Sequence, residues 1–164
     1  MKRVLCTLAI LISGCFSPLF ALSTTDELLA LVKMMSGNAT QKQMIDKLGQ
    51  PVKIQERSRR TAWYYSPANG NLKLVWDKRE NQLEVLNFTA ANAKKDTFDE
   101  TISGKLQSGK TDLTQAVKLL GFPKEMTIKE TRQELHYIYH NSVLRLFFRD
   151  NVLVDFALIG TKTD

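Results

Sequence analysis

Two stretches early in the chain carry apolar residues at helical spacing. In the first, Thr24 and Glu27 are spaced as a capping box, and Gly37 follows where the helix would end. The apolar positions between them share one helical face: Leu28, Leu29, Leu31, Val32 and Met35. This pattern predicts a helix between Thr24 and Gly37.

A second, shorter helix is expected directly after the first. Thr40 and Gln43 repeat the capping spacing. The buried side of this helix consists of Met44, Ile45 and Leu48. Gly49 suits the left-handed position beyond a helix, and Pro51 prevents the helix from resuming. The sequence Leu-Gly-x-Pro therefore predicts a helix stop that leads into a sheet.

The remainder of each half alternates between apolar and polar residues, which is the pattern of half-buried strands. In the first half, strands are expected at 52–57, 61–66, 72–76 and 83–88, with turns at 67–70 and 77–81. In the second half, strands are expected at 124–129, 134–140, 143–148 and 152–158, with a turn at 149–151.

An ungapped offset of 72 residues relates the two halves and pairs the helix stop at 48–51 with a second one at 120–123. Identical residues coincide at Thr25/Thr97, Lys33/Lys105, Ser36/Ser108, Gly37/Gly109, Gln43/Gln115, Leu48/Leu120, Gly49/Gly121, Pro51/Pro123, Arg60/Arg132, Tyr65/Tyr137, Asn69/Asn141, Leu72/Leu144 and Leu74/Leu146. Two helices are expected in the second half as well, one from Thr97 to Gly109 and one from Thr111 to Leu120. Matches at one fixed offset indicate an internal repeat.

These elements predict an α+β protein of two tandem units, each with two short helices followed by a four-stranded antiparallel meander sheet. The expected boundaries are 22–89 for the first unit, 90–96 for a linker and 97–164 for the second unit. About 70 residues bury only a modest core. Two units packed side by side would bury more, and their sheets could form one curved surface.

Residues 1–21 have the features of a signal peptide. A short basic start is followed by an apolar run from Val4 to Ile12, which is too short to span a membrane. Two processing sites compete: cleavage after Ala21, or lipidation of Cys15 in a sequence like a bacterial lipobox. The apolar stretch after Cys15 favours Ala21. The first site predicts a periplasmic protein, and the second predicts an anchored outer-membrane lipoprotein.

The motifs resemble those of SmpA/BamE-like outer-membrane proteins: a Thr-x-x-Gln helix, Leu-Gly-x-Pro, an aromatic strand with Tyr, then Leu-x-Leu-x-aromatic. Their tandem arrangement is similar to that of the β-lactamase inhibitor protein (BLIP), in which two such units form a saddle-shaped sheet. The resemblance spans about residues 24 to 160. It implies a non-enzymatic module of the cell envelope that binds another protein, in outer-membrane assembly or maintenance or as an inhibitor of an envelope or secreted enzyme.

Charge and cysteine content narrow the class of protein further. The net charge of +6 falls to +4 without the leader, a mild basic bias that does not predict nucleic-acid binding. Both cysteines lie within the first fifteen residues, so a mature domain beyond them has neither a disulfide nor thiol chemistry.

One sequence motif points to a different function. Residues Gly104 to Thr111 match the phosphate-loop pattern G-x-x-x-x-G-K-[ST], in which Lys110 would contact phosphates and Thr111 would bind Mg²⁺. This motif predicts a nucleotide-binding protein as the alternative. The residues before the motif are capped like a helix, whereas a phosphate loop follows a buried strand. The end of that helix would explain Ser108 and Gly109 without any phosphate site.

No metal site or catalytic group emerges from the sequence. His136 and His140 are the only histidines, and in one strand their Cα atoms would lie about 13 Å apart, too far to share a metal ion. No nucleophile, base or carboxylate pair stands out, so neither a cofactor nor an enzymatic activity is expected.

The alternation of the strands separates a helix-facing side of the sheet from an outer side. Tyr65, Tyr137, Leu72, Leu144, Leu74, Leu146, Trp76 and Phe148 share the parity expected to face the helices. The opposite parity carries the predicted partner-binding residues: Tyr64, Lys73, Val75, His136, Ile138, Arg145 and Phe147. Aromatic, apolar and basic residues together suit a protein-binding surface. The alternative is that the chain's own tail or the other unit covers this outer face of the sheet.

Overall fold

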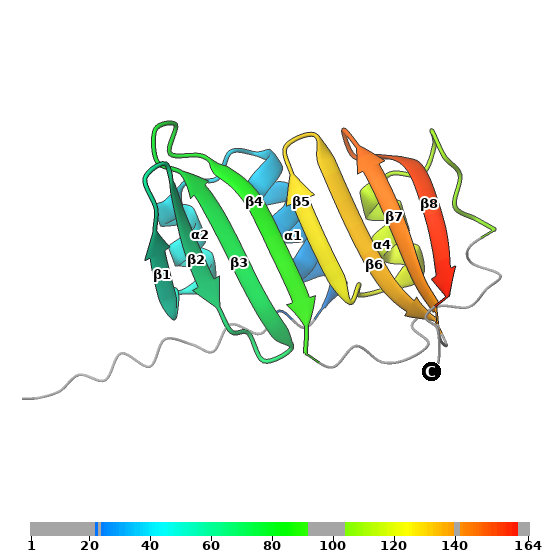
Figure 1. The fold of residues 1–164 in the computed structure, drawn as a ribbon, viewed down its shortest axis with the longest axis horizontal. Coiled ribbons are helices and arrows are strands. Elements are labelled where there is room, and N and C mark those ends of the chain that lie inside the picture. Colours follow the sequence, from blue (N-terminus) through cyan, green and yellow to red (C-terminus); the bar gives the residue numbers. More distant parts are fainter. Residues whose placement is uncertain (1–21, 23, 92–103, 140–141, 161–164) are drawn as a thin grey trace, which may run out of the picture.

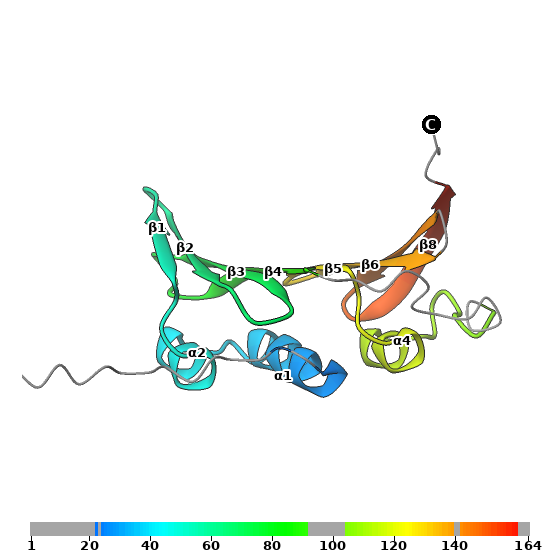
Figure 2. The same cartoon turned by 90° about the horizontal axis from the view of Figure 1, so that it is seen from below.

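The computed structural model describes residues 22, 24–91, 104–139 and 142–160. In this part of the chain, eight antiparallel strands form one sheet whose spatial order, β1 to β8, is the order of the sequence. The described helices α1, α2 and α4 all lie on one side of that sheet (Figures 1 and 2). The opposite face carries no described helix.

The helices begin and end at the residues that the local sequence favours. Helix α1 (Thr25–Ser36) has a capping box between Thr24 and Glu27, and α2 (Gln41–Leu48) has one between Thr40 and Gln43. Helix α4 (Leu113–Leu120) starts with the same device, with Asp112 as the N-cap and Gln115 as its partner. Gly49 and Gly121 end α2 and α4 at φ 77° and 80°.

The eight predicted strands are confirmed, and none of their ends is displaced by more than two residues. They are β1 (Lys53–Glu56), β2 (Arg60–Tyr65), β3 (Gly70–Asp77), β4 (Leu83–Ala90), β5 (Glu125–Lys129), β6 (Arg132–Tyr139), β7 (Ser142–Arg149) and β8 (Val152–Gly160). Sequential neighbours pair throughout, with bulges at Val75/Trp76 and at Phe147/Phe148.

The core fills the space between the sheet and the helices. Its largest fully buried side chains include Trp76, Tyr137 and Phe88. Trp63 packs on Trp76 with ring centroids 5.1 Å apart, and Phe88 meets Phe122 edge-on at 5.1 Å. The side chains predicted to face the helices are all buried, so that part of the sequence analysis is confirmed.

The middle of the sheet is the direct pairing of β4 with β5. Five residue pairs join these strands, from Val85 opposite Lys129 to Thr89 opposite Glu125. Leu86 and Ile128 face each other in this ladder and are both buried, so the core continues across it. The junction therefore makes one sheet out of two successive groups of four strands.

The sheet is curved, and its two ends turn away from the helices. Figure 2 shows β1 and β2 rising at one end and β8 at the other, with β3 to β6 running flatter between them. The helix-free side is therefore concave, and we call it the concave face.

The predicted fold of two tandem units, each with two helices and its own four-stranded sheet, is wrong. The described residues form three helices and a single eight-stranded sheet. Separate sheets would leave the backbone groups of β4 and β5 unpaired at two edges, and their direct pairing removes both edges. The expected linker at 90–96 lies almost entirely outside the described residues.

The helix expected from Thr97 to Gly109 is the second point of disagreement. Residues 97–103 lie outside the described part, and 104–110 form turns rather than a helix. This loop is attached to the outer edge of β8, because Gly109 N–H donates to the Leu153 carbonyl and Leu153 N–H donates to the Thr111 carbonyl. Those hydrogen bonds hold the turn against β8, and Gly109, at φ 77°, departs from helical geometry.

Candidate protein-binding face

One row of side chains crosses the whole concave face. The strand register places its members opposite one another in the order Lys53, Tyr64, Lys73, Asn87, Thr127, Glu134, Phe147 and Asp155. Their parity is opposite to that of the buried residues, because side chains alternate between the two faces of a strand. The row combines aromatic and charged groups at both ends with neutral polar groups in the middle.

Tyr64 is the centre of one group at the β1–β3 end. The Lys53 and Lys73 ammonium groups lie over its ring, 5.7 Å and 5.6 Å from the centroid. Its hydroxyl donates a hydrogen bond to Gln55 Oε1 at 3.0 Å. Val75 lies two residues along β3 from Lys73, opposite Ala62 and Val85. These contacts hold the aromatic ring in a fixed position beside two positive charges.

His136 is the centre of a second group at the β5–β7 end. Its Nδ1 lies 3.1 Å from Glu125 Oε2, and its Nε2 lies 2.6 Å from Glu134 Oε1. Arg145 stands directly opposite His136, and Phe147 stands opposite Glu134. The Arg145 side chain is exposed, whereas the Phe147 ring is half-buried among its neighbours.

The structure places all seven predicted partner-binding residues on the concave face, but in two groups. Tyr64, Lys73 and Val75 belong to β2 and β3. The second group, His136, Ile138, Arg145 and Phe147, belongs to β6 and β7. Strands β4 and β5 separate them. Their role in binding stays a prediction, and the predicted lipidation site Cys15 lies outside the described residues.

Sequence reasoning missed three residues of these groups: Lys53, Glu125 and Glu134. Lys53 belongs to a four-residue strand that is exposed along its length and therefore shows no alternating signal. Glu134 lies two residues before His136 on β6, at the parity that alternation assigns to the same face. Glu125 becomes a neighbour of His136 only through pairing between β5 and β6. Such contacts depend on cross-strand register, which the local pattern of one strand does not contain.

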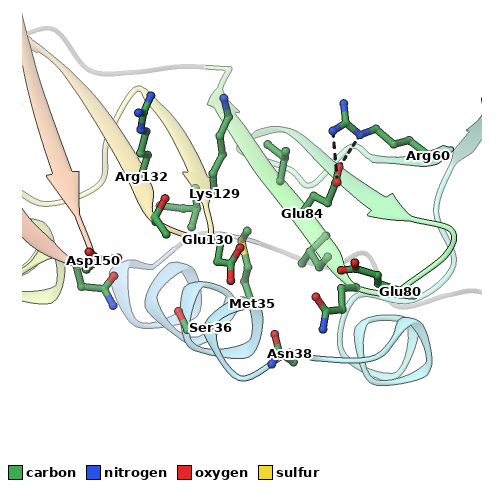
Figure 3. A pocket seen from close by; sticks show the side chains of 16 residues that line it. Met35, Ser36, Asn38, Arg60, Glu80, Glu84, Lys129, Glu130, Arg132 and Asp150 are labelled. Atoms are coloured by element: carbon green, nitrogen blue, oxygen red, sulfur yellow. Dashed lines mark hydrogen bonds and ion pairs between the residues drawn. The ribbon is translucent and has the colours of Figure 1, made fainter.

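A polar pocket of about 710 Å³ opens at the end of the β4–β5 ladder. The C-terminal turn of α1 lies below it, with Met35 and Ser36 among the lining residues (Figure 3). Arg60 Nε lies 2.6 Å from Glu84 Oε2 in its wall. Lys129 and Arg132 point away from α1, toward the concave side, whereas Glu130 lies nearer the helix. The pocket thus adjoins the concave face at the centre of the molecule.

The phosphate-loop motif does not form a phosphate cradle. The N–H groups of Gly109, Lys110 and Thr111 already donate to carbonyls of the protein, and the Thr111 hydroxyl accepts from the N–H of Gln107 at 2.8 Å. Thr111 is buried. A phosphate site needs these amides free and directed at the ligand. The geometry therefore argues against the nucleotide-binding alternative.

The perturbed pKa values in the described residues have structural causes. Burial raises the pKa of Tyr65 to about 12 and also raises the pKa of Tyr137. A hydrogen bond from Lys78 lowers the pKa of Glu56, and backbone N–H groups of Glu80 and Arg79 lower that of Asp77. None of these groups faces a pocket with a second reactive group, so they carry no catalytic assignment.

Two further observations apply only to the described residues. They contain no cluster of three potential metal ligands, and His140, the second histidine, lies outside them. None of their helices combines the length and apolar character needed to cross a bilayer.

Comparison with known structures identifies the kind of fold. The chain is similar to a presumed β-lactamase inhibitor protein from Streptococcus mutans, with a TM-score of 0.56 and 12% sequence identity over 75% of this chain and 83% of that one. A DUF4309 family protein from Bacillus subtilis matches with a TM-score of 0.30 and 11% identity over 85% of this chain and 98% of that one, too loosely to carry an argument. No protein-family model and no curated protein matches the chain.

The first similarity supports the BLIP-like fold expected from the sequence. It does not extend to an SmpA/BamE-like tandem repeat. At 12% identity the likeness concerns the fold alone, and the face must be interpreted from its own residues.

Proposed function

We propose that this chain is an exported, non-enzymatic protein that binds another envelope or secreted protein through its concave face. The observation that carries the proposal is the distribution of the layers. All described helices cover one side of the curved sheet (Figure 2). The strand register places aromatic, apolar and charged residues together on the other, concave side.

The chemistry of the face suits protein recognition. Binding energy at protein interfaces concentrates in a few aromatic and arginine side chains. Tyr64 and Phe147 supply aromatic area at the two ends, and Arg145 supplies an exposed guanidinium two residues before Phe147 on β7. A concave surface of this kind complements a protruding loop or helix of the partner.

The fold adds support for one form of this function. A protein described as a presumed β-lactamase inhibitor shares the BLIP-like arrangement, so inhibition of a secreted or envelope enzyme is one form that the binding could take. Participation in outer-membrane assembly or maintenance is the other form. In both, the leader at 1–21 directs the chain out of the cytoplasm, to the periplasm or to an outer-membrane anchor at Cys15.

Site-specific photo-crosslinking in cells that produce the chain tests the proposal. A photoreactive amino acid replaces Phe147 on the concave face in one variant and exposed Lys118 on α4 in the matched control. The proposal expects a discrete crosslinked protein from position 147 and none from position 118. Crosslinks only from position 118, or the same products from both, would contradict it.

An inhibition assay then separates the two forms of the function. The purified chain is titrated into hydrolysis of a chromogenic β-lactam by a panel of secreted β-lactamases. Saturable inhibition that is lost in Phe147→Ala would support the inhibitor form. A crosslinked partner with no effect on any of these enzymes would support the assembly form.

A further inference from the structure

Two clusters of basic side chains on the concave face lack acidic partners. The first is the cross-strand trio of Lys53, Tyr64 and Lys73, in which both lysines flank the same ring. The second consists of Lys129, Arg132 and Arg149. Arg132 and Arg149 stand directly opposite each other on β6 and β7, and Lys129 ends the neighbouring strand β5. Lys129 and Arg132 point the same way in Figure 3.

None of these five basic residues forms an ion pair with another described residue, although the chain pairs its charges elsewhere. The ammonium and guanidinium groups of Lys42, Arg60 and Lys78 lie 2.6, 2.6 and 2.8 Å from carboxylate oxygens of Asp46, Glu84 and Glu56. Like charges directly opposite in neighbouring strands destabilise a sheet. Stability therefore does not account for the Arg132–Arg149 pair. The two lysines gain cation–π contacts with Tyr64, but neither has a carboxylate partner among the described residues.

We propose that the partner presents discrete acidic side chains to these two clusters; this rests on the proposed function and specifies the partner's chemistry. Carboxylates of the partner would relieve the repulsion within each cluster on binding. The complex would then contain the ion pairs that these basic residues lack in the free protein. Attraction between the opposite charges would also raise the association rate.

The remaining charges of the face favour a protein over a nucleic acid. Glu125, Glu134 and Asp155 lie on the same surface as the clusters, and the uncharged Asn87 and Thr127 separate the first cluster from the second half of the sheet. A continuous phosphate backbone would meet those carboxylates as well as the basic groups. A folded protein can place its acidic residues over the clusters alone.

An NMR titration of the isotope-labelled chain tests this inference with defined probes. The probe is a cyclic hairpin peptide with Asp and Glu at its tip, and its matched control carries Asn and Gln there. A single-stranded DNA oligonucleotide is the third ligand. The inference expects backbone amide shifts at the two clusters with the acidic peptide, and binding at least about tenfold weaker with the neutral peptide.

Charge-matched variants assign the effect to the clusters. Lys53→Gln/Lys73→Gln should abolish the shifts at the first cluster, and Arg132→Gln/Arg149→Gln those at the second. Lys33→Gln/Lys47→Gln removes the same charge from exposed positions on α1 and α2 and should leave both sets unchanged. Urea unfolding should show Arg132→Gln/Arg149→Gln to be at least as stable as the parent, because the repulsion between two directly opposed charges has been removed.

Three results would overturn the inference. The first is equal affinity for the acidic and the neutral peptide. The second is that Lys33→Gln/Lys47→Gln weakens binding of the acidic peptide as much as the cluster variants do. The third is amide shifts at both clusters with DNA but not with the acidic peptide. No shift with any probe would also count against an acidic partner. A discrete crosslink from position 147 would still stand in each case, so the proposed function and this inference can fail separately.

Discussion

Tyr65 and Tyr137 both point from the sheet into the core, but only the Tyr137 hydroxyl has a hydrogen-bond partner in the described structure. It donates to the Gly121 carbonyl at 3.2 Å. The Tyr65 hydroxyl is buried and pairs with no described residue. The two tyrosines lie 72 residues apart, at equivalent positions of the sequence pattern. Both bury a hydroxyl, but only that of Tyr137 is hydrogen-bonded within the described structure.

Removing the two hydroxyls should therefore have opposite effects on stability. Tyr137→Phe loses a buried hydrogen bond and strands the Gly121 carbonyl, so the free energy of unfolding should fall by about 0.5–1.5 kcal/mol. Tyr65→Phe removes an unsatisfied polar group and should be neutral or stabilising by up to about 1 kcal/mol. Urea denaturation of both variants measures the difference. A larger loss for Tyr65→Phe would mean that its hydroxyl has a partner.

The same two residues predict a loss of stability at high pH. Burial raises the pKa of Tyr65 to about 12 and raises that of Tyr137, whereas tyrosines of the unfolded chain ionise near 10. Above about pH 10 the unfolded state holds fewer protons than the native state. The free energy of unfolding should then decrease by up to about 1.4 kcal/mol per pH unit for each tyrosine, and for Tyr65 the decrease ends near pH 12.

Urea midpoints at about pH 9 and about pH 11 bracket the onset of this loss. The double variant Tyr65→Phe/Tyr137→Phe should lose less stability across that interval than the parent. An equal loss of stability between these pH values in both proteins would show that lysines or arginines, rather than these tyrosines, cause the destabilisation at high pH.

The glycine that ends α4 has a backbone conformation that other residues avoid. Gly121 has φ 80° and ψ −155°, a region almost restricted to glycine, and an added Cβ would meet no atom within 4 Å. Gly121→Ala should therefore cost about 1–3 kcal/mol through backbone strain alone. Gly160→Ala is the control, since its Cβ also meets open space without a positive φ. Equal stability of the two variants would show that α4 does not need this stop.

Neighbouring residues on β7 test which side of the sheet is the core. Leu146 is fully buried, so Leu146→Ala should destabilise the fold by about 2–5 kcal/mol. Phe147 faces the concave side and is half-buried, so Phe147→Ala should cost less stability while weakening partner binding by about 1–3 kcal/mol. Thermal melting ranks the two before any partner is known. A lower melting temperature for Phe147→Ala than for Leu146→Ala would mean that the core has been assigned to the wrong face of the sheet.

Processing of the leader can be decided by intact mass. We expect cleavage after Ala21, which would make Leu22 the first residue of the mature chain. Leu22 is fully buried in the core, so the new N-terminus would be held against the fold directly after cleavage. A mass that includes acyl chains on Cys15 would show an anchored lipoprotein instead.

Local signals predicted the elements, and non-local pairing decided what the elements built. Thr24, Thr40, Gly49 and Gly121 act within one turn of the chain, and each has the role expected from its neighbours. The pairing of β4 with β5 joins strands that are separated by more than thirty residues, and no pattern within either strand specifies it. Hydrophobic periodicity therefore could not predict that the strands form a single sheet.

The binding face shows the same division. Alternation within each strand assigned Tyr64 and Phe147 to the outer side correctly, because that property belongs to one strand. Lys53 beside Tyr64 and Glu125 beside His136 come from adjacent strands, so both were missed. The identity of the partner depends on surfaces that are not part of this chain at all.

Because the strands follow one another across the sheet in the order of the sequence, the molecule has a built-in direction of mechanical weakness. A pull on the C-terminus acts on β8, an edge strand that pairs with β7 and, at its start, with the loop before α4. Peeling β8 away breaks its backbone hydrogen bonds one after another rather than together, and it leaves β1 to β7 paired. A protease or unfoldase that grips this end would therefore meet low resistance at each step, whereas a partner seated across the concave face would bridge the strands and oppose the unzipping.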